Sequence, residues 1–206
     1  MRREHGAPCG DFLCWVTKLI RQLSIYPDLL RLHGAHPQRY PFFLESVAHG
    51  TLHSRYDILF AFPGATLALV DDDVLPSNFL QTLDDAWARE AALSSAEVDA
   101  VLPFSGGWFI YLGYELAGQI EPRLALAARS TSRLPIAFAT RIPAAVIVDH
   151  HTQCTFLVAE DAALLDSMAH DLAHLSEAPP VEVAATISAL QEDGPAHFLD
   201  GVRRVK

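Results

Sequence analysis

The stretch "IAFATRIPAAVIVDHHTQCTFLVAE", residues 136–160, decides the fold that we expect. Two apolar runs, 136–140 and 144–148, have the length and composition of strands and follow one another almost directly. The polar residues 149–153 predict a hairpin-like turn, and residues 154–159 predict a third strand. This arrangement favours antiparallel pairing over a regular alternation of strands and helices.

The residues on the N-terminal side of this stretch add strands and two helices to the prediction. Pro27 suits the first turn of a helix over residues 28–33, and Gly34 supplies its stop. Further strands are predicted over residues 42–47, 56–62, 66–70 and 107–114. A second helix, over residues 78–90, has apolar residues at helical spacing, and we expect its buried face to consist of Phe79, Leu80, Leu83 and Trp87.

On the C-terminal side, Asp161 is expected to cap a helix that runs to about Leu175. Residues 181–187 are a candidate for one more strand. Residues 196–206 begin a helix whose apolar stripe has no evident partner, and we interpret this helix as truncated. The whole pattern predicts an α+β fold built on two packed, largely antiparallel sheets with flanking helices.

Residues 1–24 match no clear pattern beyond a weak amphipathic helix over residues 14–23. We interpret them as an unassigned N-terminal extension.

The composition limits the class of protein. The chain has 206 residues, of which 50% are hydrophobic and 19% are charged, so it is expected to bury a core. Its formal charge of −10 argues against nucleic acid and anionic membranes as partners, because both attract clustered Lys and Arg. Three cysteines without framework spacing indicate a reducing compartment. We therefore expect a globular protein of the cytoplasm.

Residue patterns typical of catalysis or metal binding are weak in this chain. Gly106, Gly107 and Gly113 bracket a predicted strand, whereas a phosphate-binding loop places its glycines before a helix. The histidines at 49 and 53 are four residues apart but lack a third ligand at a defined spacing. The residues themselves predict neither an acid–base pair nor a covalent nucleophile.

The segment "PFFLESVAHG", residues 41–50, places the carboxylate of Glu45 directly after three apolar residues. A carboxylate is rarely buried without hydrogen-bond donors, because its desolvation is costly. Two interpretations stay open. Either Glu45 faces water while its neighbours point inward, or the fold places a negative charge beside the hydroxyl of Ser46.

Three ordered blocks of the chain and its C-terminal segment resemble a known family. Residues 27–64, "PDLLRLHGAHPQRYPFFLESVAHGTLHSRYDILFAFPG", resemble the start of the chorismate-utilising enzymes aminodeoxychorismate synthase component I and anthranilate synthase component I. Residues 103–124, "PFSGGWFIYLGYELAGQIEPRL", look like a second block of the same N-terminal region. Within residues 143–160, "PAAVIVDH" and "FLVAE" are similar to the paired strands that follow, and the terminal "FLDGVRRVK" looks like the helix that leads into the chorismate-binding domain.

This resemblance implies a domain assignment and a function. Residues 25–190 would form an anthranilate synthase component I-like N-terminal domain, and residues 191–206 would begin a truncated chorismate-binding domain. The blocks "GGWFIYLGYELAGQIEP" and "LFAFP" look closer to aminodeoxychorismate synthase, which makes 4-amino-4-deoxychorismate from chorismate and ammonia for p-aminobenzoate and folate. The alternative is anthranilate synthase component I, in tryptophan biosynthesis. An autonomous amino-acid-binding regulatory module is the alternative of another class.

The resemblance also implies a binding site. In the family, the segment that matches Leu44, Glu45 and Ser46 lines a pocket for tryptophan. A carboxylate and a hydroxyl suit the ligand's ammonium group, and apolar strand residues suit its indole ring. Phe43 stands where the family motif commonly has Leu, and its larger ring would narrow the pocket.

The family's catalytic groups and its Mg²⁺ ligands belong to the C-terminal domain, so the resemblance implies no catalytic residue, cofactor or metal site in this chain. It implies two protein partners: the missing chorismate-binding domain and a glutamine amidotransferase subunit. L-tryptophan is the implied small-molecule ligand. We further expect the chain alone to expose an apolar surface and to associate.

Overall fold

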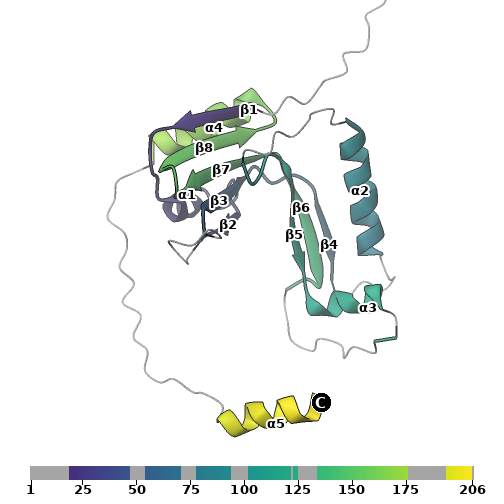
Figure 1. Ribbon diagram of the computed structural model, residues 1–206. Coiled ribbons are helices and arrows are strands. Elements are labelled where there is room, and N and C mark those ends of the chain that lie inside the picture. Colours follow the sequence, from purple (N-terminus) through teal and green to yellow (C-terminus); the bar gives the residue numbers. More distant parts are fainter. Residues whose placement is uncertain are drawn as a thin grey trace, which may run out of the picture. The chain divides into compact units, whose positions relative to one another are not determined.

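The computed structural model describes residues 19–46, 54–70, 78–93, 102–121, 123–124, 134–175 and 194–205 (Figure 1). The chain divides into two compact units between Leu175 and Ser176. The first unit contains all the described strands, and the described part of the second is one helix, α5 (Pro195–Val205). This helix matches the one predicted over residues 196–206, whereas the strand predicted over residues 181–187 lies outside the described residues.

The larger sheet of the first unit has five antiparallel strands. Their spatial order is β1-β8-β7-β3-β2, and their bounds are Leu19–Leu23, Cys154–Ala159, Ala144–Asp149, Tyr56–Ala61 and Phe42–Leu44, in that order. The hairpin of β7 and β8, with Asp149 opposite Cys154, lies at its centre. This is the hairpin that the opening stretch of sequence predicts.

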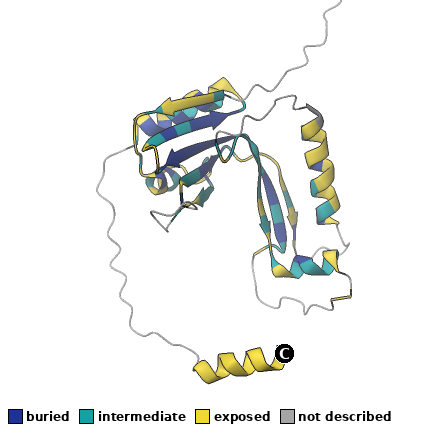
Figure 2. Cartoon of the chain, in the orientation of Figure 1, coloured by how far each residue is buried: buried dark blue, intermediate teal, exposed yellow. Residues whose placement is uncertain are grey.

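Both faces of the central strand β7 are buried, which explains its unbroken apolar run (Figure 2). One face packs on the helices α1 (Leu29–Ala35) and α4 (Ala162–Ala173), which contribute Leu32 and Met168 to a common core. The other face contributes Ile147 to a second cluster, against which Phe104 packs. Asp28 and Asp161 cap the two helices by accepting hydrogen bonds from the backbone N–H groups of Arg31 and Ala163.

The smaller sheet has three antiparallel strands in the order β4-β6-β5, with bounds Thr66–Leu69, Ala137–Ile142 and Gly107–Leu112. Helix α2 (Phe79–Leu93) packs on it, and Phe79 joins the core between helix and sheet. A short helical segment, η1 (Tyr114–Leu116) and α3 (Ala117–Ile120), follows β5. These elements confirm the predicted α+β fold with two largely antiparallel sheets.

The two sheets are joined through β6 and β7. Strand β6 ends at Ile142 in the smaller sheet and β7 begins at Ala144 in the larger one, so Pro143 alone connects them. Aromatic rings also connect the sheets, because Phe42 of β2 stacks on Phe109 of β5 with the ring centroids 4.1 Å apart.

Two expectations about individual elements are wrong. Trp87 is 60% exposed, and Ala86 is buried in its place, because the buried stripe of α2 follows Phe79, Leu83 and Ala86 at helical spacing. Residues 19–23, which we expected at the end of a weak helix, form the strand β1 and pair with β8. Backbone pairing with the edge of the sheet outweighs the weak helical pattern.

None of the described helices is long and apolar enough to cross a membrane.

Candidate functional site

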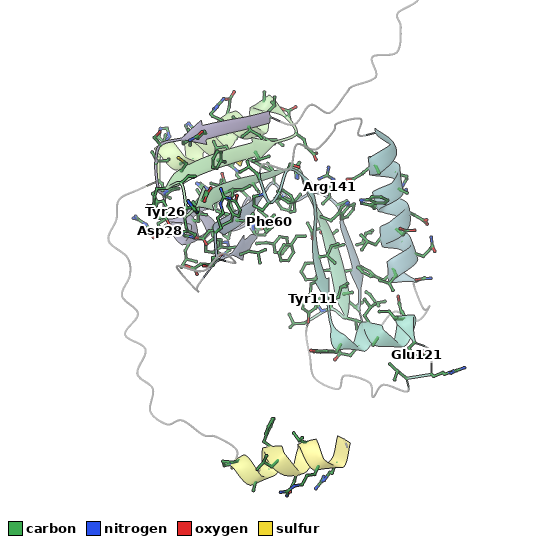
Figure 3. The ribbon with its side chains drawn as sticks, in the orientation of Figure 1. Tyr26, Asp28, Phe60, Tyr111, Glu121 and Arg141 are labelled. Atoms are coloured by element: carbon green, nitrogen blue, oxygen red, sulfur yellow. The ribbon has the colours of Figure 1, made fainter. Side chains whose placement is uncertain are left out.

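A small cavity lies beside the predicted site segment, between the larger sheet and the start of α1. Its volume is about 120 Å³, and it is lined by Tyr26, Pro27, Asp28, Leu29, Leu30, Phe43, Glu45, Asp57 and Val148. The lining comes from the segment that leads into α1, from the first residues of α1, and from the ends of β2, β3 and β7. Figure 3 shows Tyr26 and Asp28 close together at this end of the larger sheet.

Of the three predicted site residues, only Glu45 lines this cavity. It lies one residue past the end of β2, and its side chain is exposed. Within the described part of the chain, no hydrogen bond or ion pair to its carboxylate is found. Leu44 is 50% exposed and lies outside the lining. Glu45 is thus an exposed carboxylate that also lines the cavity, so both interpretations of the sequence stay open.

Ser46 has a different local role from the expected one. Its hydroxyl donates to the backbone carbonyl of Tyr56 (2.7 Å), and its N–H donates to Oδ1 of Asp57 (2.7 Å). The Ser46 hydroxyl therefore donates its proton within the protein, and toward a ligand it can act only as a hydrogen-bond acceptor. Ser46 holds the end of β2 against β3 and fixes the carboxylate of Asp57.

Asp57 belongs to a chain of polar side chains that ends at the cavity. Nε2 of His150 lies 2.9 Å from Oδ1 of Asp57, and Nδ1 of the same ring is hydrogen-bonded to the hydroxyl of Tyr26. Burial, and then the charge of Asp57, raise the pKa of Tyr26, so this hydroxyl stays protonated. The chain fixes Tyr26 and Asp57 on the wall of the cavity.

Three carboxylates, those of Asp28, Glu45 and Asp57, line the same small cavity beside the apolar Phe43 and Val148. One oxygen of Asp28 accepts the capping hydrogen bond from Arg31. A group of carboxylates around a small volume suits a cationic head such as an ammonium. The cavity is well below the roughly 300 Å³ at which pockets begin to hold whole drug-sized ligands. It therefore suits the charged end of a larger molecule.

Sequence reasoning missed Tyr26, Asp28, Asp57 and His150. A usable signal existed for Asp57, because it interrupts the apolar run of β3 as Glu45 interrupts the run beside β2. Tyr26 and His150 are more than a hundred positions apart in the sequence, and the local sequence around either residue does not predict their contact.

A second, more open hollow lies at the C-terminal end of α1. It has a volume of about 610 Å³ and is lined by Ala35, His36, Pro37, Gln38, Arg39, Phe62 and Pro63. Nη1 of Arg39 donates to both carboxylate oxygens of Asp171 on α4, and the fully buried Tyr40 donates its hydroxyl to the same carboxylate (2.6 Å). This network ties the loop after α1 to α4.

The ionisation of this network follows from its contacts. Burial acts to raise the pKa of Asp171, but the hydrogen bonds from Tyr40 and Arg39 outweigh burial and lower it. Burial and the bond to Asp171 raise the pKa of Tyr40 far above its usual value. Asp171 is therefore a paired anion and Tyr40 a neutral donor. We assign the network a structural role.

Among the described residues, no group of three or more His, Cys, Asp or Glu side chains could hold a metal ion. No family model matches the chain, and no curated protein matches it either.

Proposed function

We propose that this chain is the N-terminal portion of a chorismate-utilising synthase of the aminodeoxychorismate type, and that the cavity at Glu45 receives the ammonium group of an amino acid such as L-tryptophan. One observation carries the proposal. A segment that resembles the family's ligand-binding motif places an unpaired carboxylate, Glu45, in a cavity that Asp57 also lines. The ammonium would bind to these carboxylates through charge-assisted hydrogen bonds.

The small volume of the cavity bears on the rest of the ligand. The cavity has a volume of about 120 Å³, which is too small to hold both an ammonium group and an indole ring. In this proposal the ring lies outside the described cavity, against apolar surface from the chorismate-binding domain. That domain, with its Mg²⁺, and a glutamine amidotransferase subunit are the partners that the proposal includes. The acidic composition and the three cysteines support the cytoplasm as its compartment.

A second candidate, an autonomous amino-acid-binding module, is favoured by one observation. The nine described residues that line the cavity lie between positions 26 and 148, inside the first compact unit. Such a module would bind the amino acid without another domain.

Calorimetric titration separates the two candidates. L-tryptophan is titrated into the 206-residue chain alone and into its mixture with a C-terminal chorismate-binding domain of the family. Saturable binding in the mixture only is expected for the synthase portion, and saturable binding by the chain alone is expected for the module. Absence of binding in both titrations contradicts both candidates.

The role of Glu45 is tested with Glu45→Gln, which keeps the size of the side chain and removes its charge. We expect it to weaken tryptophan binding by at least about tenfold, the value of one charge-assisted hydrogen bond. Ser46→Ala should weaken binding less, because the Ser46 proton is already donated to Tyr56. Glu121→Gln, at an exposed position outside the cavity, is the matched control.

A ligand control completes this test. Indole-3-propionate lacks the ammonium, so its weaker binding should not respond to Glu45→Gln. Saturable tryptophan binding that Glu45→Gln leaves unchanged would show that Glu45 is an ordinary solvent-facing residue.

A further inference from the structure

Strand β5 differs from the other edge strands of the two sheets. The edges are β1 and β2 in the larger sheet and β4 and β5 in the smaller one. Exposed edges pair with further strands unless they are short, charged or covered. β2 has three residues and β4 has four, while β1 carries Arg21, which forms an ion pair with Asp166. Each of these three edges thus has one of the usual protections.

β5 has none of these protections. It has six residues, Gly-Trp-Phe-Ile-Tyr-Leu, without a charge or a proline, and its aromatic and β-branched residues favour extended structure. Within the described ranges, no strand pairs with its outer side, and Figure 1 shows it at the free edge of the smaller sheet. Its outer N–H and C=O groups therefore offer a row of hydrogen-bonding positions that only another extended chain can match.

The side chains along this edge are apolar on both faces of the sheet. On the face that α2 covers in part, Ile110 and Leu112 are 46% and 53% exposed, although their cross-strand neighbours Ala139 and Ala137 are fully buried. On the other face, Phe109 and Tyr111 are half-buried and stack beside Phe138. A strand added at this edge would cover apolar surface on both faces.

We infer that β5 pairs with β5 of a second copy of this chain, in antiparallel register about a two-fold axis at Ile110. In this register Ile110 meets its own copy, Trp108 meets Leu112, and Phe109 meets Tyr111, so every pair combines apolar or aromatic side chains on one face. Identical strands can meet in this way because β5 carries no charge that would oppose its own copy. The pairing joins two three-stranded sheets into one continuous sheet.

Sedimentation velocity of the 206-residue chain over a concentration series tests this inference. We expect a monomer–dimer equilibrium, and Ile110→Lys should raise the dissociation constant at least about tenfold, because it places two like charges opposite each other. Ile20→Lys is the matched control, since Ile20 is 54% exposed on the edge strand β1 and should leave the equilibrium unchanged. A chain that stays monomeric throughout, or a dimer that Ile110→Lys does not weaken, overturns the inference.

Cysteine trapping tests the register. With Cys9, Cys14 and Cys154 replaced by serine, Ile110→Cys should form a disulfide-linked dimer, because directly opposed residues have Cα atoms about 4.5–5.5 Å apart. Leu112→Cys is the control, since it opposes Trp108 and lies far from its own copy along the strands. Cross-linking through Leu112→Cys and not through Ile110→Cys overturns the proposed pairing.

Discussion

At the scale of single residues, Asp149 shows how a buried charge is retained inside an apolar sheet. It ends β7 and is 1% exposed. Nη2 of Arg55 donates to its Oδ2 (2.7 Å), and the backbone N–H of His151 donates to its Oδ1 (2.9 Å). The Arg55 hydrogen bond is the main cause that lowers the pKa of Asp149 to about 2. One carboxylate thus neutralises a cation and closes the hairpin turn.

We predict that Asp149→Asn destabilises the protein by about 2 kcal/mol at neutral pH. This is the free energy that corresponds to lowering the pKa of Asp149 from about 4 to about 2 on folding. Because the folded-state pKa is lowered, this stability is present above about pH 4 and is lost as the pH falls toward about 2. Urea unfolding of both proteins across this range measures the difference.

The matched control for this prediction is Asp166→Asn. Asp166 pairs with Arg21, but its side chain is 69% exposed, so the change should stay within about 0.5 kcal/mol. An Asp149→Asn protein whose stability parallels the wild type down to about pH 2 would contradict the assigned role of the charge.

At the scale of elements, the hairpin of β7 and β8 contains local strain. Gln153, the last residue of its turn, has a φ of 55°, in the left-handed region that costs a residue with a side chain about 1–2 kcal/mol. Its side-chain amide donates to the carbonyl of His150 (2.9 Å) on the exposed surface. The turn tolerates this conformation because the strands on both sides of it are buried.

We predict that Gln153→Gly stabilises the hairpin by about 1 kcal/mol, because glycine adopts positive φ without steric cost. Gln153→Ala is the comparison, since it loses the same amide bond and keeps the strain. Thermal unfolding should order the three proteins with Gly above wild type and Ala at or below it. A Gly variant less stable than the Ala variant would show that the turn is not strained.

The same elements show what could be predicted from the sequence. The strand Cys154–Ala159 and the helix that Asp161 caps follow the prediction because apolar runs and capping residues act locally. The strand β1 and the exposure of Trp87 escaped prediction, because tertiary contacts decided both. At the candidate site, Glu45 was predictable as a charge in an apolar segment. Asp57 gave a similar signal, but its position beside Glu45 was not predictable, since the register of β2 on β3 brings the two residues together.

At the scale of the whole first unit, Arg141 holds together elements of both sheets. Its Nη2 pairs with Glu160, which follows β8 (2.6 Å), its Nε pairs with Glu90 on α2 (2.5 Å), and its Nη1 donates to the carbonyl of Gly107 on β5 (3.0 Å). Figure 3 shows Arg141 where the two sheets meet. One guanidinium therefore connects three elements, which a lysine could not reproduce.

We predict that Gly106→Ala breaks this connection and costs about 2 kcal/mol or more. Gly106 has a φ of 108°, and a Cβ there would lie 2.3 Å from Oε1 of Glu160. Gly34→Ala is the matched control, and its expected effect on stability has the opposite sign. Apart from its chain neighbours and the backbone of α1, no atom of the described residues lies within 4 Å of a Cβ at this position, so alanine should stabilise by about 0.5–1 kcal/mol. Equal effects of the two substitutions on the melting temperature would contradict the role of Glu160.

The one-residue connection between β6 and β7 at Pro143 limits insertions and deletions at this point of the chain. Adding or removing one residue there would turn all the side chains of β6 or of β7 to the opposite face, because successive strand residues alternate between faces. The turn at residues 150–153 has no such restriction, since its ends return to neighbouring strands. Sequences that share this fold should therefore differ in length at the hairpin turns and keep a constant spacing between the apolar runs on either side of position 143.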